Sequence, residues 1–161
     1  MTIFEYNKSV DDHADGIFRF VLKNIKNEDK AKDIVQDTYE KLWIKVSEVS
    51  SEKVKSYLFT TAYHTMIDIL RKEKRITLFD TGKHDQHAKT DHYTGLSEIL
   101  EDAMSKLPEI QRCVIMLRDY EGHSYEEISS ITGLNETQVK VYIFRGRMFL
   151  KKYIGSIEAL I

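Results

Sequence analysis

Apolar residues recur three or four positions apart along most of the chain, which is the spacing of amphipathic helices. In the N-terminal half this pattern predicts three helices. The first covers residues 17–25 and starts near Asp12 or Asp15, the second spans about 29–46, and the third about 54–75. Trp43 falls on the expected apolar stripe of the second helix. Residues 46–53 have no such period and are rich in Ser and Glu, so we expect a loop there.

The helical pattern stops between residues 76 and 95, where polar residues dominate. It resumes at Leu96, which is expected to face inward, and Pro108 fits the first turn of the helix that follows. Gly122 is placed to end that helix. The sequence therefore predicts an all-α protein of two small helical domains, residues 1–75 and 96–161, joined by a flexible linker at 76–95.

Residues 122–147 have the pattern of a helix-turn-helix. Ser124 and Glu127 are spaced as a capping box at the start of a short helix. Gly133 suits a tight turn with positive φ, and Asn135 with Gln138 forms a second capping box. A short helix, a glycine turn and a second helix is the layout with which many proteins read duplex DNA.

The outer face of the second helix is basic, which supports that interpretation. Between Glu136 and Lys152 five Lys and Arg residues face one acid, Glu136. A helix that enters the major groove needs polar residues at base edges and cations beside phosphates. The alternative is an ordinary solvated face on a helical hairpin.

Two faces of the N-terminal half also carry candidate chemistry. Residues 57–64 hold several aromatics just before a basic run at 71–75, a combination that suits single-stranded DNA. The alternative is that the aromatics are core and the cations complement the helix dipole. On the second helix an acidic face, which includes Asp33 and Asp37, is either a solubility feature or a docking face for a basic partner.

Composition excludes several classes of protein. The chain has 161 residues, with 42% hydrophobic and 31% charged residues, and a formal net charge of −2, as in ordinary globular proteins. Cys113 is the only cysteine, so no internal disulfide can form, and a reducing, cytoplasmic location is expected. We see no apolar run long enough to span a membrane, no signal peptide and no glycine-rich phosphate loop.

Three segments, in order, resemble the extracytoplasmic-function (ECF) branch of the sigma-70 family of RNA polymerase sigma factors. AKDIVQDTYEKLW at 31–43 resembles the region 2 helix that grips the β′ clamp of core polymerase. SYLFTTAYHTMIDILRK at 56–72 resembles the stretch that melts and captures the minus-ten element. LPEIQRCVIMLRDYEGHSYEEISSITGLNETQVKVYIFRGR at 107–147 resembles region 4, which binds the minus-thirty-five element and the β flap.

The resemblance implies three groups of functional residues. The polymerase-binding residues would be Asp33, Gln36, Asp37, Glu40 and Trp43. The minus-ten residues would be Tyr63, His64, Asp68, Arg71, Lys72 and Arg75, with His64 where many relatives have asparagine. The minus-thirty-five residues would be Thr137, Gln138, Lys140, Val141, Tyr142, Phe144, Arg145 and Arg147.

The implied function is that of a sigma factor, which directs core polymerase to specific bacterial promoters without being an enzyme. Its implied partners are core RNA polymerase, promoter DNA and an anti-sigma protein, with no membrane insertion, cofactor or metal. Free in solution, the two domains are expected to pack together and hide the DNA-reading helix.

Three other classes remain as alternatives. A helix-turn-helix regulator that binds its operator alone would explain 122–147 but leaves the N-terminal domain unexplained. A sigma-like decoy that binds only a regulator would not need the basic faces. An enzyme is the least favoured class, since Asp33 and Asp37 have no His or Ser partner, and His84, His87 and His92 fall in the linker without cysteines.

Overall fold

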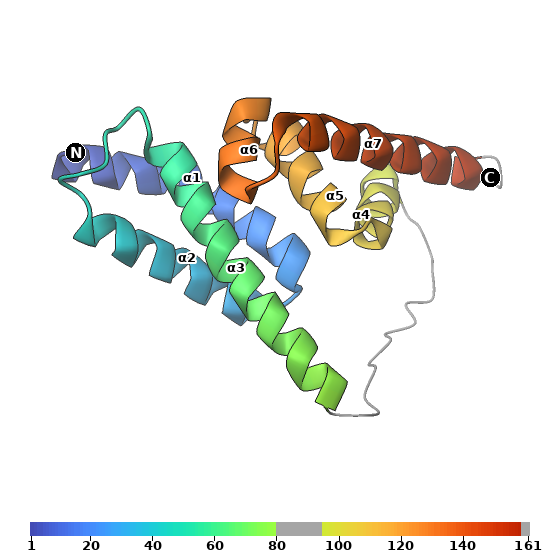
Figure 1. The fold of residues 1–161 in the computed structure, drawn as a ribbon, viewed down its shortest axis with the longest axis horizontal. Coiled ribbons are helices and arrows are strands. Elements are labelled where there is room, and N and C mark those ends of the chain that lie inside the picture. The colour runs from blue at the N-terminus through green and yellow to red at the C-terminus, as the bar shows by residue number, and fades with distance from the viewer. Residues whose placement is uncertain (80–94, 159–161) are drawn as a thin grey trace.

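The computed structural model describes residues 1–79 and 95–158, and every regular element within these ranges is helical. The elements are α1 (Ile3–Ile25), α2 (Glu28–Ile44), α3 (Val54–Phe79), α4 (Leu96–Lys106), α5 (Glu109–Ile115), the π-helical turn η1 (Met116–Tyr120), α6 (Tyr125–Thr132) and α7 (Glu136–Glu158). Figure 1 shows α1–α3 as one bundle, here called the N-terminal bundle, and α4–α7 beside it as the C-terminal bundle. The predicted all-α fold class is confirmed.

The N-terminal bundle packs its three helices around a shared apolar core. Its centre includes Phe20, Leu42 and Phe59, all fully buried, with the rings of Phe20 and Phe59 edge to face at 6.0 Å. The start of α1 differs from the prediction, because the helix begins at Ile3 rather than near Asp12 or Asp15. Thr2 and Glu5 form a capping box there, a local signal that lies ahead of the periodic region.

Helix α3 continues to Phe79, four residues beyond the predicted end of the N-terminal domain at 75. Ile76 and Leu78 are 65% and 79% exposed, so the last turn forms without packing against the bundle. The other residues of the predicted linker, 80–94, lie outside the described residues, together with the three histidines considered there.

The C-terminal bundle places α7 of the helix-turn-helix on a platform of α4 and α5, while α6 packs against α7 and η1. Pro108 lies at the N-terminal boundary of α5, as predicted, whereas Leu96 is 65% exposed and does not face inward. Gly122 has a φ of 73° and follows η1, as expected for a residue that ends a helix. Helix α7 packs against α4, α5 and α6.

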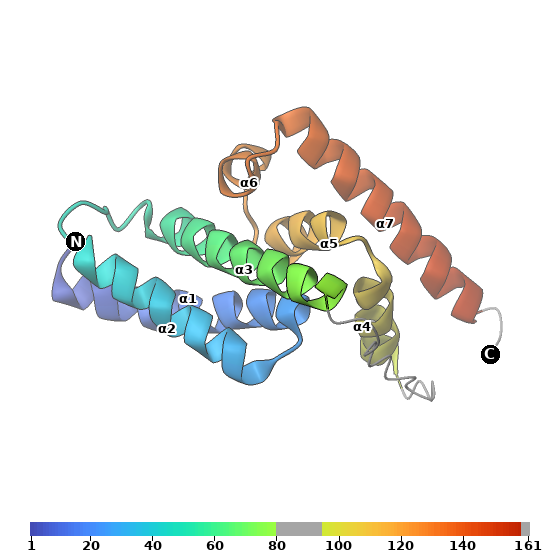
Figure 2. The same ribbon diagram turned by 60° about the horizontal axis from the view of Figure 1, so that its bottom comes forward.

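The two bundles pack on one another through α3 with α6 and through α1 with α5. Their buried side chains form one continuous apolar cluster. Figure 2, turned by 60°, shows α6 above α3 and α7 on the side away from α2. The expected packing of the two domains is therefore present, but it covers α3 and leaves the outer face of α7 open. None of the described helices is both long and apolar enough to cross a membrane.

Candidate functional site

The helix-turn-helix is built by the local signals that predicted it. Glu127 N donates to Ser124 Oγ at 3.1 Å, and the Glu127 carboxylate accepts from Ser124 N, which completes the first capping box. Gly133 ends α6 with a φ of 79°. At the start of α7, Gln138 N donates to Asn135 Oδ1 at 2.8 Å, and Asn135 N donates to Gln138 Oε1 at 3.1 Å. Both predicted caps and the glycine turn are confirmed.

The outer face of α7 projects most of the predicted minus-thirty-five residues into solvent. The exposed members of that set are Thr137, Gln138, Lys140, Val141, Phe144, Arg145 and Arg147. Val139 and Ile143 face the core, as the sequence pattern predicted. Phe144 is 65% exposed, which is unusual for a phenylalanine and leaves its ring available for a partner. This face therefore combines cations with apolar groups that can contact a base or its methyl group.

Several of the predicted minus-thirty-five residues already have partners within the bundle. The Arg147 guanidinium forms a two-bond ion pair with Asp119 of η1, including Nε to Oδ2 at 3.1 Å. Gln138 serves the cap of α7, and Tyr142 is only partly exposed because it packs against the core. Arg145, by contrast, has no hydrogen-bond or ion-pair partner within residues 1–79 and 95–158.

Lys140 is held at the surface by an aromatic ring. Its Nζ lies 5.5 Å from the centre of the Tyr125 ring, whose other cation is Arg118, with Cζ at 4.4 Å. Tyr125 is the first residue of α6, so the ring joins the two helices of the motif. Such cation–π contacts orient a cation without neutralising it.

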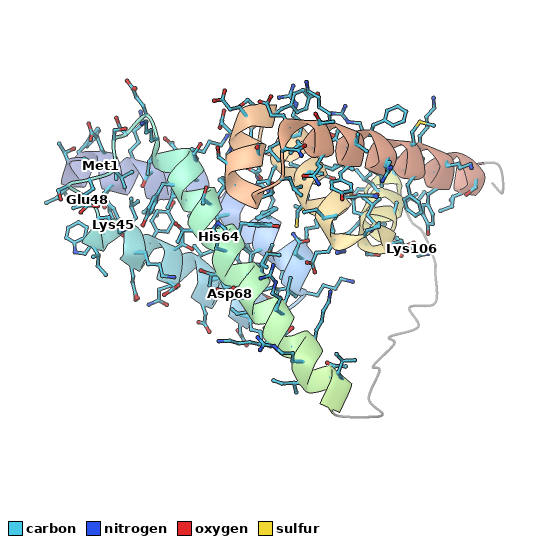
Figure 3. All side chains as sticks on the ribbon, in the orientation of Figure 1. Met1, Lys45, Glu48, His64, Asp68 and Lys106 are labelled. Carbon is cyan, nitrogen blue, oxygen red and sulfur yellow. The ribbon has the colours of Figure 1, made fainter. Side chains whose placement is uncertain are left out.

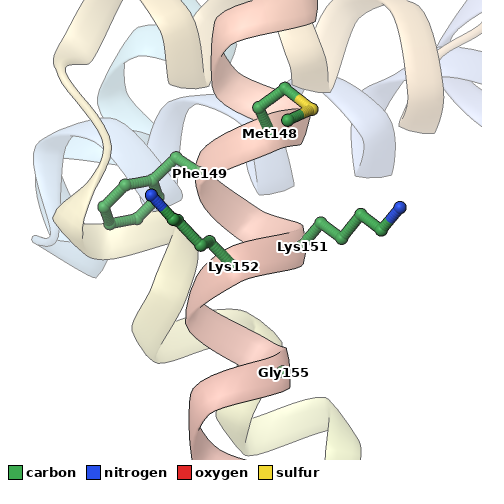
Figure 4. Close-up of a pocket in the computed structure, with 5 residues that line it drawn as sticks. All are labelled: Met148, Phe149, Lys151, Lys152 and Gly155. Atoms are coloured by element: carbon green, nitrogen blue, oxygen red, sulfur yellow. The ribbon is translucent and has the colours of Figure 1, made fainter.

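Further along α7 the surface has a shallow hollow lined by Met148, Phe149, Lys151, Lys152 and Gly155 (Figure 4). Met148 is 52% exposed, and the two lysines extend the basic face by another turn. The whole exposed length of α7 is therefore apolar in part and positive in charge.

On α3 the predicted minus-ten residues divide into two sets. His64, Asp68, Arg71, Lys72 and Arg75 are exposed along one side of the helix, and Figure 3 labels His64 and Asp68 on successive turns. Tyr63 is only 7% exposed, and Phe59 is fully buried. Burial raises the pKa of Tyr63 to about 12, with smaller contributions from Cys113 and Glu109 of α5. In this arrangement the Tyr63 ring is not accessible to a DNA base, and its predicted contact with the minus-ten element stays a prediction.

On α2 the acidic face is confirmed as an exposed surface, and Trp43 belongs to it. Asp33, Gln36 and Glu40 are exposed and Asp37 is half-exposed. Trp43 is 50% exposed, so its predicted place on the apolar stripe is wrong. Its ring lies edge to face against Tyr6 at 5.2 Å, because α1 begins early enough to reach the end of α2. Trp43 thus extends the acidic face along one side of the helix.

A polar cluster between the two bundles was missed by the sequence reasoning. It joins Asn24 of α1 to Arg112 of α5 and places His123 against Phe59 of α3. No local pattern identifies these contacts, since the partners lie far apart in the chain. An apolar run interrupted by Arg112, and a histidine just before a cap, were the available hints.

The described residues contain no group of three His, Cys, Asp or Glu side chains that could bind a metal ion. Cys113 is fully buried, and burial raises the pKa of its thiol to about 12. A thiol of this kind is neutral and unreactive at neutral pH.

Two family profiles match the chain in the order of its two bundles. Sigma-70 region 2 matches residues 10–76, and Sigma-70 region 4 matches residues 97–150. The RNA polymerase sigma factor SigV of Bacillus subtilis is 34% identical over 145 residues, which cover 88% of this chain and 86% of SigV. The ECF RNA polymerase sigma factor SigM of the same organism is 32% identical over 144 residues, or 86% of this chain and 88% of SigM.

Solved structures of the same fold agree with these matches. The sigma factor RpoE of Bartonella quintana, solved in complex with the anti-sigma factor NepR, superposes with a TM-score of 0.80 at 24% identity. The superposition covers 95% of this chain and 98% of RpoE, so it spans both bundles. The helix-turn-helix, the region matches and the similarity to SigV and SigM place this chain in the ECF branch of the sigma-70 family of RNA polymerase sigma factors.

Proposed function

We propose that this sigma factor reads the minus-thirty-five promoter element with the exposed face of α7 and the minus-ten element with α3. The observation that carries the proposal is the basic outer face of α7, presented by a fully capped helix-turn-helix. Residues 1–75 would act as region 2, 76–95 as a linker and 96–161 as region 4. The chain itself would make and break no covalent bond.

On α7, Arg145 is the strongest candidate to read a base edge. It is exposed and unpaired among the described residues, whereas Arg147 is bound to Asp119. Arg147 therefore fits a role in fixing α7 on its platform, with at most a phosphate contact. Lys140, oriented over Tyr125, is suited to a phosphate.

On α3, the exposed side from His64 to Arg75 would hold the unpaired strand. His64 can stack on a base and donate a hydrogen bond, and Arg71, Lys72 and Arg75 supply positive charge beside the backbone. Tyr63 would join this surface only if the two bundles move apart.

The acidic face of α2 with Trp43 would bind the β′ clamp of core polymerase, and the C-terminal bundle would bind the β flap. The four acidic or amide side chains of this face lie beside the exposed Trp43 ring. Such a surface is complementary to a basic partner surface with an apolar centre. An anti-sigma protein is a further proposed partner, because RpoE and CnrH, which share this fold, were solved with NepR and with the cytosolic domain of CnrY. Partners of this kind would place the protein in the cytoplasm.

Run-off transcription with purified core polymerase and a library of promoter fragments tests the proposal. Transcripts that depend on the chain and share a two-element sequence support it. Tight binding of duplex DNA by the chain alone, without any dependent transcript, would instead favour an operator-binding regulator.

Matched variants locate the two interfaces. Arg145→Ala should abolish most of the transcription that depends on the chain. Lys151→Ala also removes one exposed positive charge from α7, but it should reduce this transcription only slightly. Asp33→Lys should weaken binding to core polymerase, whereas Glu48→Lys, in the loop after α2, should not. Equal effects within either pair would argue against the assigned face.

A further inference from the structure

The outermost line of α7 is apolar. Residues three and four positions apart share one face of an α-helix, and Val139 and Ile143 mark the face of α7 that is turned to the core. Val141, Phe144 and Met148 repeat at the same spacing on the opposite side and are 38%, 65% and 52% exposed. We call these three side chains the outer ridge. Single exposed apolar residues are common, but a contiguous row of them marks a surface with a partner.

Cations flank the outer ridge on both sides. Each residue of a helix is turned by about 100° from the one before it. Lys140 and Arg147 directly precede members of the ridge, whereas Arg145 directly follows one, so they project to opposite sides of it. Lys140 Nζ lies 5.5 Å from the centre of the Tyr125 ring, and Arg147 Nε donates to Asp119 Oδ2 at 3.1 Å. The outer face of α7 is therefore an apolar line between two basic edges, one of which is held in place by neighbouring side chains.

This arrangement matches the cross-section of the major groove of duplex DNA. A helix that lies in the groove has base edges beneath its outermost line and a phosphate backbone along each side. The outer ridge of α7 would therefore face the bases, and the cations on its two edges would face the two backbones. The choice of base directly beneath the ridge then depends on apolar contact rather than on charge.

Thymine is the base that an apolar ridge can recognise. In the major groove every base edge presents hydrogen-bonding groups, and only thymine adds an apolar one, its 5-methyl group. The side chains of Val141 and Phe144 can neither donate nor accept a hydrogen bond. Against the polar edge of another base they would displace water without replacing its hydrogen bonds, which is unfavourable. The ridge therefore favours base pairs that contain thymine.

Two members of the ridge lie where a recognition helix meets base edges. Helix α7 begins at Glu136, which places Val141 in its second turn and Phe144 in its third. The N-terminal part of a recognition helix is the part that contacts bases. Val141 and Phe144 are separated by about 4.5 Å along the helix axis, close to the spacing of about 3.4 Å between neighbouring base pairs. Met148 lies about 6 Å further along the axis, beyond the part that meets the bases.

We propose that Val141 and Phe144 read the 5-methyl groups of thymines in two neighbouring base pairs of the minus-thirty-five element. This inference rests on the proposed role of α7 and adds the chemical feature that the helix selects. Arg145, beside Phe144, remains the candidate for a hydrogen-bonded base, and Lys140 the candidate for a phosphate. Recognition at the two positions beneath the ridge thus depends on one methyl group each.

Replacement of thymine by deoxyuridine tests the contact, because it removes the 5-methyl group and keeps every hydrogen-bonding group of the base. The probe is a promoter fragment from the run-off library, bound by the holoenzyme of the full-length chain and core polymerase, with the thymines of its minus-thirty-five element replaced one at a time. At the two positions beneath the ridge the affinity should fall roughly fourfold each, the loss expected for one buried methyl group. An unchanged affinity at every thymine would overturn the proposal. So would an element without thymine in two neighbouring base pairs.

Variants of the ridge show whether the protein itself contacts the methyl groups. Phe144→Ala and Val141→Ala should each weaken binding to the thymine fragment and abolish the effect of deoxyuridine at one of the two positions. Met148→Ala is the matched control on the same ridge and should retain both effects, while circular dichroism monitors the helical content of each protein. If both deoxyuridine effects persist in the two alanine variants, the methyl groups act through the shape of the DNA, and the proposal fails.

Failure of the proposed function appears separately, as an absence of chain-dependent transcription with core polymerase, and it would remove this inference with it. Arg145→Ala distinguishes the two failures on the same fragment. Weaker binding by Arg145→Ala, together with wild-type binding that is insensitive to deoxyuridine, would show that α7 reads the element without the ridge.

Discussion

Gly146 lies where α7 crosses α5, and it offers the sharpest stability prediction. A Cβ atom at this position would be 2.2 Å from Ile115 Cδ1, 3.3 Å from Ile115 Cγ1 and 3.6 Å from Gln111 Cβ. Ile115 is 2% exposed and held in the core, so it cannot swing into solvent to make room. Gly146→Ala therefore forces the side chain or the two helices to move by more than 1 Å, towards an ordinary contact of about 3.6 Å.

The magnitude follows from two opposing effects. Overpacking of a tight core site costs about 1–3 kcal/mol, while replacing glycine by alanine inside a helix gains about 1 kcal/mol. We therefore expect Gly146→Ala to lower the free energy of unfolding by up to about 2 kcal/mol. Gly155→Ala on the same helix meets no atom within 4 Å, so it should raise the free energy of unfolding by about 0.5–1 kcal/mol.

Urea unfolding followed by circular dichroism measures both changes, and a double-mutant cycle tests the cause. Ile115→Val deletes the clashing Cδ1 atom, so it should cost about 1 kcal/mol in the wild-type chain. In the Gly146→Ala background it should cost almost nothing or be stabilising. Two results would refute this reasoning: Gly146→Ala stabilises the chain as Gly155→Ala does, or the effects of Gly146→Ala and Ile115→Val are additive. In either case the close approach of α5 and α7 is not the reason for glycine at position 146.

Three more predictions concern single side chains. Asn135→Ala should lower the free energy of unfolding by about 1 kcal/mol in urea, while Asn135→Ser keeps most of it, because serine can also cap α7. Arg147→Ala should lower the free energy of unfolding by about 0.5–1 kcal/mol, because the ion pair with Asp119 is lost. Arg145→Ala should leave the free energy of unfolding unchanged and weaken binding to duplex DNA by about 1–3 kcal/mol. The reverse pattern would exchange the roles of the two arginines. Burial lowers the pKa of His123 below its ordinary value of 6.5, so the stability from the neutral ring is complete above 6.5 and is lost as the pH falls below it. The urea midpoint should therefore fall from pH 7.5 to about 5.5 less steeply in His123→Gln than in the wild type, and equal slopes would refute this.

The surroundings of His123 explain the direction of that pH effect. Burial is the largest influence on its pKa and lowers it, and Lys55 of α3 acts in the same sense. The carboxylates of Glu127 and Glu121 act in the opposite sense but do not outweigh burial. For Glu127, burial alone would raise the pKa, but the hydrogen bonds with His123 and Ser124 prevail and lower it. The pair is thus held as a neutral ring beside an ionised carboxylate near neutral pH.

The features predicted correctly from the sequence are those set by neighbours in the chain. Ser124, Gly133 and Asn135 act through residues three or four positions away, so their roles in the caps and turn could be read from spacing alone. The core positions Val139 and Ile143 followed from the helical period in the same way.

Contacts between distant segments could not be predicted in this way. Trp43 fits the apolar period of α2, yet its indole is half-exposed beside the fully buried Leu42, and its ring contact is with Tyr6 of α1. The burial of Tyr63 depends likewise on packing, because the C-terminal bundle covers it; its role as a DNA contact stays a prediction. Neither outcome is encoded within one helix, because both depend on how the helices pack.

The half-exposed indole on α2 has a practical consequence, since it is the only tryptophan of the chain. Supplied as 5-fluorotryptophan during expression, it would give a single fluorine resonance in a complex whose polymerase was made without the label. That resonance would shift if the clamp covers the acidic face, and it would stay in place if only the C-terminal bundle docks. One spectrum could thus follow the order in which the two halves of the factor engage polymerase.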